Sequence, residues 1–195
     1  MATTITATTD LEAVNSMLQA IGADPVNSLA STDDSDVINA KALLSEVSRE
    51  VQSQGWDFNV DTEYVIARTV DNEYVVPPNC IDIDISDSLP GIRGVFRGGK
   101  LWNQEKHTFS WDVALKFDVT WLFPFNELPQ SAKHYIAMKS ARKFQARTVG
   151  ASSLEKYTEQ DEQDAYSIFK DAEALSADYS MLTGPVAFRI LYRRA

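Results

Sequence analysis

An amphipathic pattern that stops at a glycine constrains the fold of this chain more than any other feature of its sequence. Between residues 37 and 54, apolar side chains recur at steps of three and four and therefore share one face of a helix. These residues are Val37, Ala40, Leu44, Val47 and Val51. Asp33, Asp34 and Ser35 provide N-cap side chains and negative charge where the helix begins. Gly55 tolerates the left-handed conformation that commonly ends a helix.

Two aromatic residues follow this glycine at once, separated by one position. In an extended segment, Trp56 and Phe58 would point to the same side of the backbone and clamp the end of the helix to a core. We therefore predict that Gly55, Trp56 and Phe58 form a structural signature at the edge of the core.

A shorter helix is predicted near the N-terminus, from about Leu11 to Ile21. Thr9 or Asp10 can cap its start, and Gly22 followed by Pro25 ends it.

The C-terminal third of the sequence predicts two longer helices, over about Ser131–Thr148 and Ser152–Tyr179. Plausible core positions of the first are Ala132, Tyr135, Ile136, Ala141 and Phe144. The apolar stripe of the second is Leu154, Tyr157, Ala165, Ile168, Ala172, Leu175, Tyr179 and Leu182.

The middle of the chain changes to a period of two, which is typical of strands. Ile81, Ile83 and Ile85 alternate with polar residues, as in a half-buried strand. Further strand candidates are Tyr64–Val70, Tyr74–Val76, Ile92–Phe96, Lys100–Trp102 and Val113–Thr120. Gly98-Gly99 between two short strands predicts a hairpin turn.

These elements predict an α+β fold, with a bundle of about four helices, an inserted small antiparallel β subdomain and an extended C-terminal tail. The expected boundaries are a flexible N-terminal arm at 1–9, a helical part at 10–62, a β-rich subdomain at 63–122, a second helical part at 123–182 and a docking tail at 183–195.

The net charge of the chain is −10. Proteins that grip the DNA backbone usually present a basic surface, so the overall charge disfavours a DNA-binding module built on the basic helix near residue 140. An acidic wall could instead let a duplex slide past, or the charge could serve only solubility. No apolar run approaches the ~20 residues that span a bilayer, and the N-terminus lacks the pattern of a signal peptide.

The two C-terminal helices differ in charge. The first carries Lys133, Lys139, Arg142, Lys143 and Arg147, and the second is mainly acidic. A short connection makes the two helices antiparallel neighbours. Opposite charge could pair them within one chain, or pair the basic helix of one subunit with the acidic helix of the next.

A search for catalytic chemistry is mostly negative. The sequence has no zinc-ligand spacing, no P-loop and no nucleophile elbow, so we expect no cofactor, no metal and no enzymatic activity. His134 is expected on a helix surface, and Cys80 is expected to pack as a small apolar residue. Asp82 and Asp84 share one face of a strand and could act as the acid and base of a polysaccharide hydrolase, but alternation alone accounts for both residues.

The last ten residues, VAFRILYRRA, are too apolar to remain free in water. We predict that this tail docks on a partner rather than on its own β subdomain. The predicted docking residues are Phe188, Arg189, Ile190, Leu191, Tyr192, Arg193 and Arg194.

Four segments together resemble the tail tubular protein A (adaptor) family of short-tailed, T7-like bacteriophages. They are Leu11–Leu29, Asn39–Asp61, Phe123–Gly150 and Leu154–Leu182, in the order of the family. The region from Glu63 to Thr120 does not match position by position.

The resemblance implies a structural adaptor of the virion tail, which assembles in the host cytoplasm. Family members form a dodecameric ring that docks on the portal protein, receives the tail nozzle (tail tubular protein B) and meets the tail fibres at this junction. Double-stranded DNA passes through the central channel during ejection without sequence-specific binding. The resemblance also implies that the C-terminal segment engages the portal. The alternative function is a tail-associated polysaccharide hydrolase.

Overall fold

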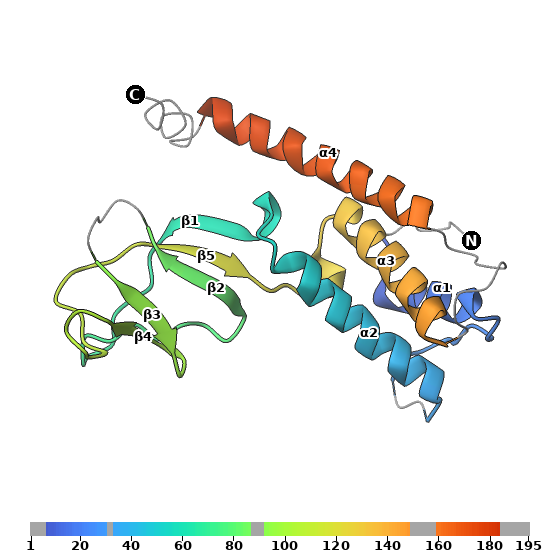
Figure 1. Cartoon of the computed structure of the whole chain (residues 1–195), viewed down its shortest axis with the longest axis horizontal. Coiled ribbons are helices and arrows are strands. Elements are labelled where there is room, and N and C mark those ends of the chain that lie inside the picture. Colours follow the sequence, from blue (N-terminus) through green and yellow to red (C-terminus); the bar gives the residue numbers. More distant parts are fainter. Residues whose placement is uncertain (1–6, 31–32, 87–91, 149–158, 184–195) are drawn as a thin grey trace, which may run out of the picture. The chain divides into compact units, whose positions relative to one another are not determined.

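The computed structural model describes residues 7–30, 33–86, 92–148 and 159–183, with side chains up to Ser176. The chain divides into two compact units. The helical unit combines the chain up to Val51 with the chain from Pro124 onward, and the β unit is Gln52–Phe123 (Figure 1). The predicted docking tail lies outside the described residues, as do the first six residues of the predicted arm.

Helix α1 spans Asp10–Ala20 and begins with a capping box at Thr9. The Glu12 amide donates to Thr9 Oγ1 at 3.2 Å, and the Thr9 amide donates to Glu12 Oε2 at 2.9 Å. Two backbone donors at Gly22 and Ala23 close the other end, and Gly22 has a φ of 80°. The predicted helix and both of its end signals are confirmed.

Helix α2 spans Ser35–Gln52. The Asp34 side chain accepts a hydrogen bond from the Asp36 amide at 2.8 Å, as expected of an N-cap. Gly55 has a φ of 71°, and its amide donates to the Gln52 carbonyl. All five residues of the predicted apolar stripe are buried.

Helices α3, Gln130–Thr148, and α4, Glu159–Thr183, lie side by side in the helical unit (Figure 1). The ring of Tyr135 on α3 stacks on Phe169 of α4 at 5.7 Å, and Arg142 pairs with Glu162. Residue numbers fall along α3 as they rise along α4, so the helices are antiparallel, as predicted. The five predicted core residues of α3 are buried.

The predicted stripe of α4 is wrong at two positions. Ile168 is 58% exposed and Leu175 is 73% exposed, whereas Phe169 is completely buried. The helix is rotated so that the larger aromatic side chain, rather than Ile168, packs on Tyr135. Ala165 is buried as predicted. Leu154 and Tyr157 lie outside the described residues, as do the side chains of Tyr179 and Leu182.

The β unit contains an antiparallel three-stranded sheet in the order β1-β5-β2 (Figure 1). Its strands are Val60–Tyr64, Phe117–Trp121 and Cys80–Ile85, respectively. Strands β3, Gly94–Arg97, and β4, Lys100–Asn103, form a separate hairpin.

The hairpin turn is confirmed at Gly98-Gly99. Arg97 pairs with Lys100, so the loop has two residues, and both glycines have positive φ, 60° and 78°. Those angles are the type I′ geometry that matches the twist of the flanking strands.

The predicted strand Tyr64–Val70 is wrong beyond Tyr64, and the predicted strand Val113–Thr120 is confirmed only from Phe117 onward. Residues 65–70 form no strand: Val65 is 68% exposed and Val70 is fully exposed. Val113 lies four residues before the observed strand β5 and is 46% exposed. Valine composition predicts a half-buried extended segment only where a neighbouring strand supplies hydrogen bonds and packing.

The core of the β unit is a cluster of large side chains, namely Tyr74, Leu101, Trp111, Leu115, Phe117, Val119 and Trp121. Its polar atoms are paired: the Trp111 indole donates to the Leu101 carbonyl at 3.0 Å, and the Tyr74 hydroxyl accepts from the Leu115 amide at 2.8 Å. The described residues form four α-helices and small antiparallel sheets, so the predicted α+β class is confirmed.

Candidate functional site

The segment after Gly55 is organised by Asn59 rather than by the two aromatic residues. Trp56 is extended, but Asp57–Asn59 forms a turn of 3₁₀ helix, so the expectation of an extended segment fails at Phe58. Asn59 closes this turn by accepting from the Trp56 amide at 2.8 Å. Trp56 and Phe58 are half-buried, whereas Asn59 is fully buried.

Buried amides join the beginning of the β unit to its end. The Asn59 side chain donates to the carbonyls of Gln52 and Trp121, each at 2.9 Å. The Gln52 side chain donates to the Phe123 carbonyl at 3.0 Å and accepts from the Phe123 amide at 2.8 Å. We call Gln52 and Asn59 the amide buckle. The sequence analysis did not predict these buried roles of Gln52 and Asn59. The one available signal was the presence of two amide residues in a segment that otherwise has a strong core pattern.

The basic residues of α3 are mainly paired with α2 of the same chain. Glu50 of α2 accepts from Lys139 at 3.1 Å and from Lys143 at 2.6 Å, and Glu46 pairs with Arg147 at 2.9 Å. Hydrogen bonds from Lys143 and Lys139 lower the pKa of Glu50 despite its partial burial.

Between α3 and α4, Arg142 pairs with Glu162. The buried Lys133 ammonium donates to the Asn126 carbonyl at 2.7 Å. All five basic side chains of α3 therefore have partners within their own chain, so an intersubunit contact between α3 and α4 would have to compete with them.

Asp82 and Asp84, the candidate acid and base, lie two residues apart on β2. Both are exposed on β2, and each carboxylate accepts a hydrogen bond from the next backbone amide, at 3.0 and 2.8 Å. Glycoside hydrolysis requires one carboxyl group in an environment that favours its protonated form, typically a desolvated one. The exposed face of β2 offers no such environment.

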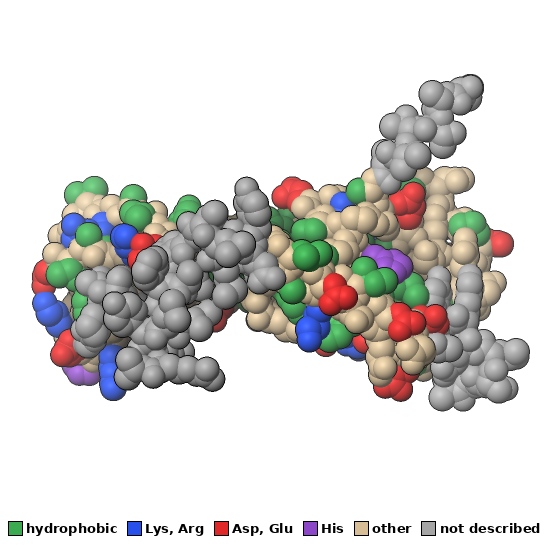
Figure 2. All heavy atoms as spheres, turned by 90° about the horizontal axis from the view of Figure 1, so that it is seen from above, with side chains coloured by type: hydrophobic (Ala, Val, Ile, Leu, Met, Phe, Trp, Pro, Cys, Tyr) green, Lys and Arg blue, Asp and Glu red, His purple; other side chains and the backbone are tan. Residues whose placement is uncertain are grey.

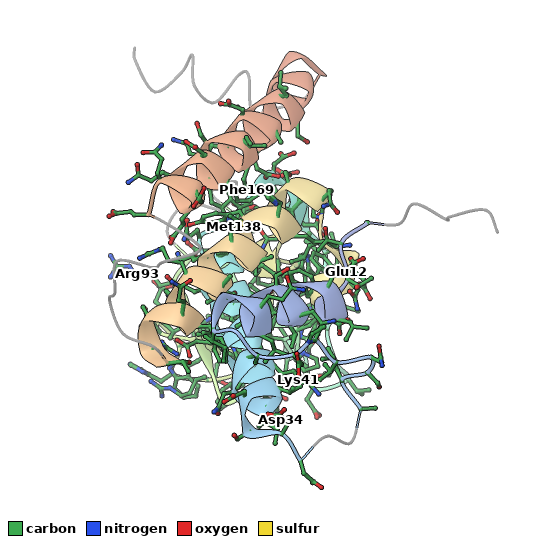
Figure 3. All side chains as sticks on the ribbon, turned by 90° about the vertical axis from the view of Figure 1, so that its right-hand side faces the viewer. Glu12, Asp34, Lys41, Arg93, Met138 and Phe169 are labelled. Carbon is green, nitrogen blue, oxygen red and sulfur yellow. The ribbon has the colours of Figure 1, made fainter. Side chains whose placement is uncertain are left out.

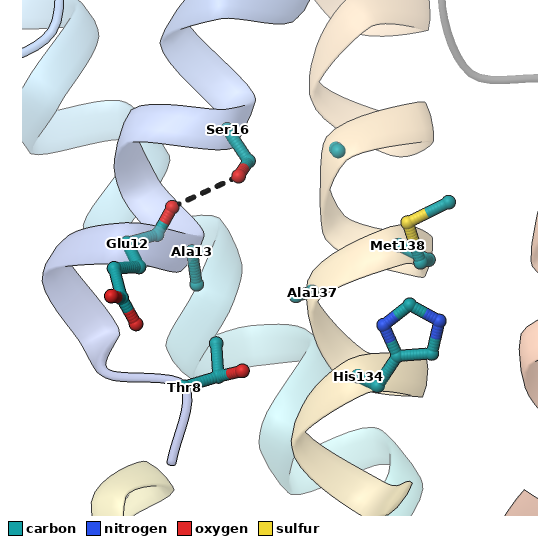
Figure 4. A pocket seen from close by; sticks show the side chains of 8 residues that line it. Thr8, Glu12, Ala13, Ser16, His134, Ala137 and Met138 are labelled. Atoms are coloured by element: carbon teal, nitrogen blue, oxygen red, sulfur yellow. Dashed lines mark hydrogen bonds between the residues drawn. The ribbon is translucent and has the colours of Figure 1, made fainter. Parts of the chain in front are cut away.

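A hollow of about 440 Å³ lies between α1 and α3 (Figure 4). Its polar side chains include Glu12 and His134. The Glu12 carboxylate is already used in the capping box, and His134 is exposed, as expected from the sequence.

A second hollow, of about 390 Å³, lies in the β unit beside Tyr64 and Trp121. Its carboxylate, Asp61, accepts from the Trp121 indole at 2.8 Å and so holds the ring in place. Neither hollow is lined by Asp82 or Asp84.

The β3–β4 hairpin carries a basic and aromatic cluster. The Arg97 guanidinium lies 5.1 Å from the Trp102 ring centre, and Trp102 meets Phe109 edge to face at 4.7 Å. Lys100, beside this cluster, forms an ion pair with Glu73 at 2.5 Å. On the face shown in Figure 2, acidic side chains are prominent over the helical unit, and basic and acidic side chains are interspersed over the β unit.

Other chemistry-bearing residues are isolated. Cys80 is half-buried, and burial raises the pKa of its thiol, which disfavours the reactive thiolate. Within the described residues, no three His, Cys, Asp or Glu side chains are placed to hold a metal ion. The described helices include none that is long and apolar enough to cross a membrane.

Comparison with known families gives the context for this fold. No curated protein matches the chain. A family model for tail tubular proteins matches residues 11–179, which include α1 from its second residue, α2, the β unit, α3 and α4 up to Tyr179. The match covers most of the sequence, so the chain belongs to the tail tubular protein family of phages and is a structural component of the phage tail.

Proposed function

We propose that this protein is the adaptor subunit that joins the portal to the tail nozzle of a short-tailed phage and surrounds part of the channel for DNA ejection. The family match over residues 11–179 carries the proposal. The partners are the portal protein, tail tubular protein B, the tail fibre and further copies of this chain in a dodecameric ring. Assembly takes place in the host cytoplasm, and the protein has no enzymatic activity.

The C-terminal tail is proposed as the portal anchor. Phe188, Ile190, Leu191 and Tyr192 supply apolar contacts, and Arg189, Arg193 and Arg194 supply donors for carboxylates of the portal. The matched family region ends before this tail, so the proposal for the tail rests on its composition and on what the resemblance of the four segments implies.

The net charge of −10 suits a channel that DNA traverses without being held, because a negative wall repels phosphate groups. Acidic residues exposed on α4, such as Asp164 and Asp171, are candidates for surfaces near the DNA or for contacts with a neighbouring subunit.

Negative-stain microscopy and native mass spectrometry of the protein, alone and mixed with its portal, test this function. We expect a ring, either free or capping the portal. Deletion of residues 184–195 should leave the chain folded but weaken binding to the portal. Replacement of Arg189, Arg193 and Arg194 by Ala, with the apolar residues kept, separates the charge contribution from the apolar one. A wild-type chain that stays monomeric and ignores the portal would refute the adaptor function.

The hydrolase alternative has a direct assay. If the purified protein cleaves capsular or starch-like polysaccharide and Asp82→Asn abolishes the cleavage, the proposed absence of enzymatic activity is wrong.

A further inference from the structure

The outer side of the β3–β4 hairpin presents basic and apolar side chains together. Gly94 faces the core, because an added Cβ there would meet three core side chains at 2.9 to 3.2 Å. The ladder of the hairpin continues to Arg93, whose carbonyl accepts from the Gln104 amide at 3.1 Å. Since side chains alternate along a strand, Arg93, Val95 and Arg97 point away from the core, and all three are exposed.

Neighbouring segments extend this outer side into a continuous surface. Val95 pairs with Trp102 and Arg97 pairs with Lys100, so each pair of side chains lies on the same face of the hairpin. Val75 is joined to Lys100 by a further β-bridge and is 47% exposed. We call this surface the hairpin face, and it consists of Val75, Arg93, Val95, Arg97, Lys100 and Trp102.

The two arginines of the hairpin face are available for a partner. Lys100 is neutralised by Glu73 at 2.5 Å, whereas within the residues that the structure describes neither arginine forms an ion pair. Arg97 instead lies over the ring of Trp102. Exposed arginine, tryptophan and aliphatic side chains together are typical of a protein interface, because a nucleic-acid backbone offers the valines nothing to pack on. The partner that fits is therefore an acidic protein surface with apolar side chains among its acids.

Helix α4 exposes a surface of this kind. Asp164, Ile168, Asp171 and Leu175 are all exposed and follow one another at steps of four, three and four. This spacing places them on one side of the helix, whereas Phe169 faces α3 (Figure 3). Among the described residues, no cation forms an ion pair with either aspartate. We call these four residues the acidic stripe.

We propose that the hairpin face of one subunit binds the acidic stripe of the next subunit in the ring. Arg93 and Arg97 are four strand residues apart, ~13 Å, and Asp164 and Asp171 are seven helical residues apart, ~10 Å. The long arginine side chains cover the difference, so two charge-assisted pairs form at once.

The charged pairs enclose an apolar centre. Val95 stands between the arginines and Ile168 stands between the aspartates, so these two side chains meet in the middle of the contact and exclude water from it. Leu175 extends the apolar contact at the end of the acidic stripe. The proposal thus explains why Ile168 and Leu175 remain 58% and 73% exposed in the single chain.

The contact also has the symmetry that a ring needs. The hairpin face and the acidic stripe are different surfaces, so identical subunits that bind through them associate head to tail, and a head-to-tail contact closes into a ring when its rotation permits. The proposal rests on the proposed ring and names the surfaces that build it.

Two charge-reversal variants test the contact. The first, Arg93→Glu with Arg97→Glu, makes the hairpin face acidic. The second, Asp164→Arg with Asp171→Arg, makes the acidic stripe basic. Each variant alone presents like charges at every subunit contact, so we expect it to lose rings by roughly tenfold or more relative to wild type.

An equimolar mixture of the two variants should regain the rings, because the two chains can alternate with opposite charges at every contact. Such a ring needs an even number of subunits, as the expected dodecamer has. The mixture also distinguishes a contact between subunits from a contact within one chain. In each variant both surfaces of the same chain carry the same sign, so mixing would not restore a contact within a chain.

The readout is the mass and the negative-stain image of the assembly, measured at low and high salt, with the portal added if the wild type needs it. Salt should weaken the wild-type and mixed rings alike. Two matched controls should assemble like wild type. Lys41→Glu with Arg49→Glu reverses two exposed cations of α2, and Asp24→Arg with Glu127→Arg reverses two exposed acids of the helical unit outside α4. Circular dichroism confirms that each variant is folded.

The outcomes separate the interface from the adaptor function. If wild type and both reversal variants form rings equally well, the ring stands and the proposed interface is wrong. Rings of the first variant that form normally but no longer bind tail tubular protein B would assign the hairpin face to the nozzle, and the proposal would again be wrong. If the single variants fail and their mixture fails as well, the charge pairing between subunits is wrong. If the wild type forms no ring even with the portal, the proposed function fails, and the interface proposal fails with it.

Discussion

The helical unit and the β unit are stabilised by different kinds of polar contact. In the helical unit, α2, α3 and α4 are linked by partly exposed ion pairs, such as Lys143 with Glu50. In the β unit, the buried, neutral side chains of Gln52 and Asn59 join segments that lie far apart in the sequence. Exposed pairs contribute little each and are screened by salt, whereas a buried amide is costly to leave without its partners.

Buried amide contacts and partly exposed ion pairs therefore have different roles in the two units. Buried amides specify one arrangement of the β unit. Surface ion pairs of the helical unit neutralise the cations of α3 and leave the outer sides of α2 and α4 for other contacts. The two units can also be observed separately, because all four tryptophans lie in the β unit, while the helices dominate far-UV circular dichroism.

The largest effect is expected from Phe169→Ala. This completely buried ring stacks on Tyr135, and its removal leaves a cavity between α3 and α4. We expect the free energy of unfolding to fall by about 3–5 kcal/mol. The loss should appear in denaturant titrations followed by circular dichroism. Measurements are made at concentrations where the chain is monomeric.

Ile168→Ala is the matched control for this change. It removes a neighbouring side chain that is mostly exposed in the monomer, so its effect on unfolding should be small. Equal destabilisation by the two substitutions would show that α4 docks with a different face.

Asn59→Ala should destabilise the β unit by about 2–4 kcal/mol. It removes the acceptor of the Trp56 amide and one donor to each of the carbonyls of Gln52 and Trp121. Tryptophan fluorescence should report an earlier transition. Asn79→Ala changes an exposed asparagine of the same unit and should have little effect. In both Phe169→Ala and Asn59→Ala, the unfolding transitions followed by fluorescence and by circular dichroism could shift by the same amount. That result would show that the two units unfold together, and their stabilities could not be compared separately.

Gly94→Ala should cost the β unit about 1–3 kcal/mol through overpacking. An added Cβ would come within 2.9 Å of Ile85 Cδ1 and 3.2 Å of both Leu101 and Trp111. Ile85→Val removes the nearest of these atoms. The double variant should therefore lose less stability than the sum of the two single variants, as measured by tryptophan fluorescence. Simple additivity would mean that the Ile85 contact is not the cause.

The features that sequence predicted well depend on a few neighbouring residues. The capping box at Thr9, the helix end at Gly55 and the turn at Gly98-Gly99 are each set by local backbone chemistry. The features it missed depend on distant partners.

In the amide buckle, the Gln52 side chain binds the backbone of Phe123, which is far away in the sequence. No local pattern predicts which amide side chains will be buried in this way. Ile168 and Phe169 are adjacent and both apolar, so only the position of Tyr135 decides which of them faces the core. The proposed docking residues in the tail remain a prediction.

The smallest expected effect is the pH dependence of the Glu50 ion pairs. Hydrogen bonds from Lys143 and Lys139 lower the pKa of Glu50 below its ordinary value of 4.5. The folded state therefore releases this proton more readily than the unfolded state does. The resulting stability is fully present above pH 4.5 and is lost as the pH falls through the lowered pKa.

Glu50→Gln should accordingly lower the stability of the helical unit by about 1 kcal/mol or less near neutral pH, because solvent screens these partly exposed pairs. The difference from wild type should shrink as the pH falls below 4.5 and shrink also in high salt. Denaturant titrations followed by circular dichroism measure both trends. A difference that persists in acid and in salt would show that Glu50 acts through packing, and the helical unit would then resemble the β unit in how its polar groups stabilise it.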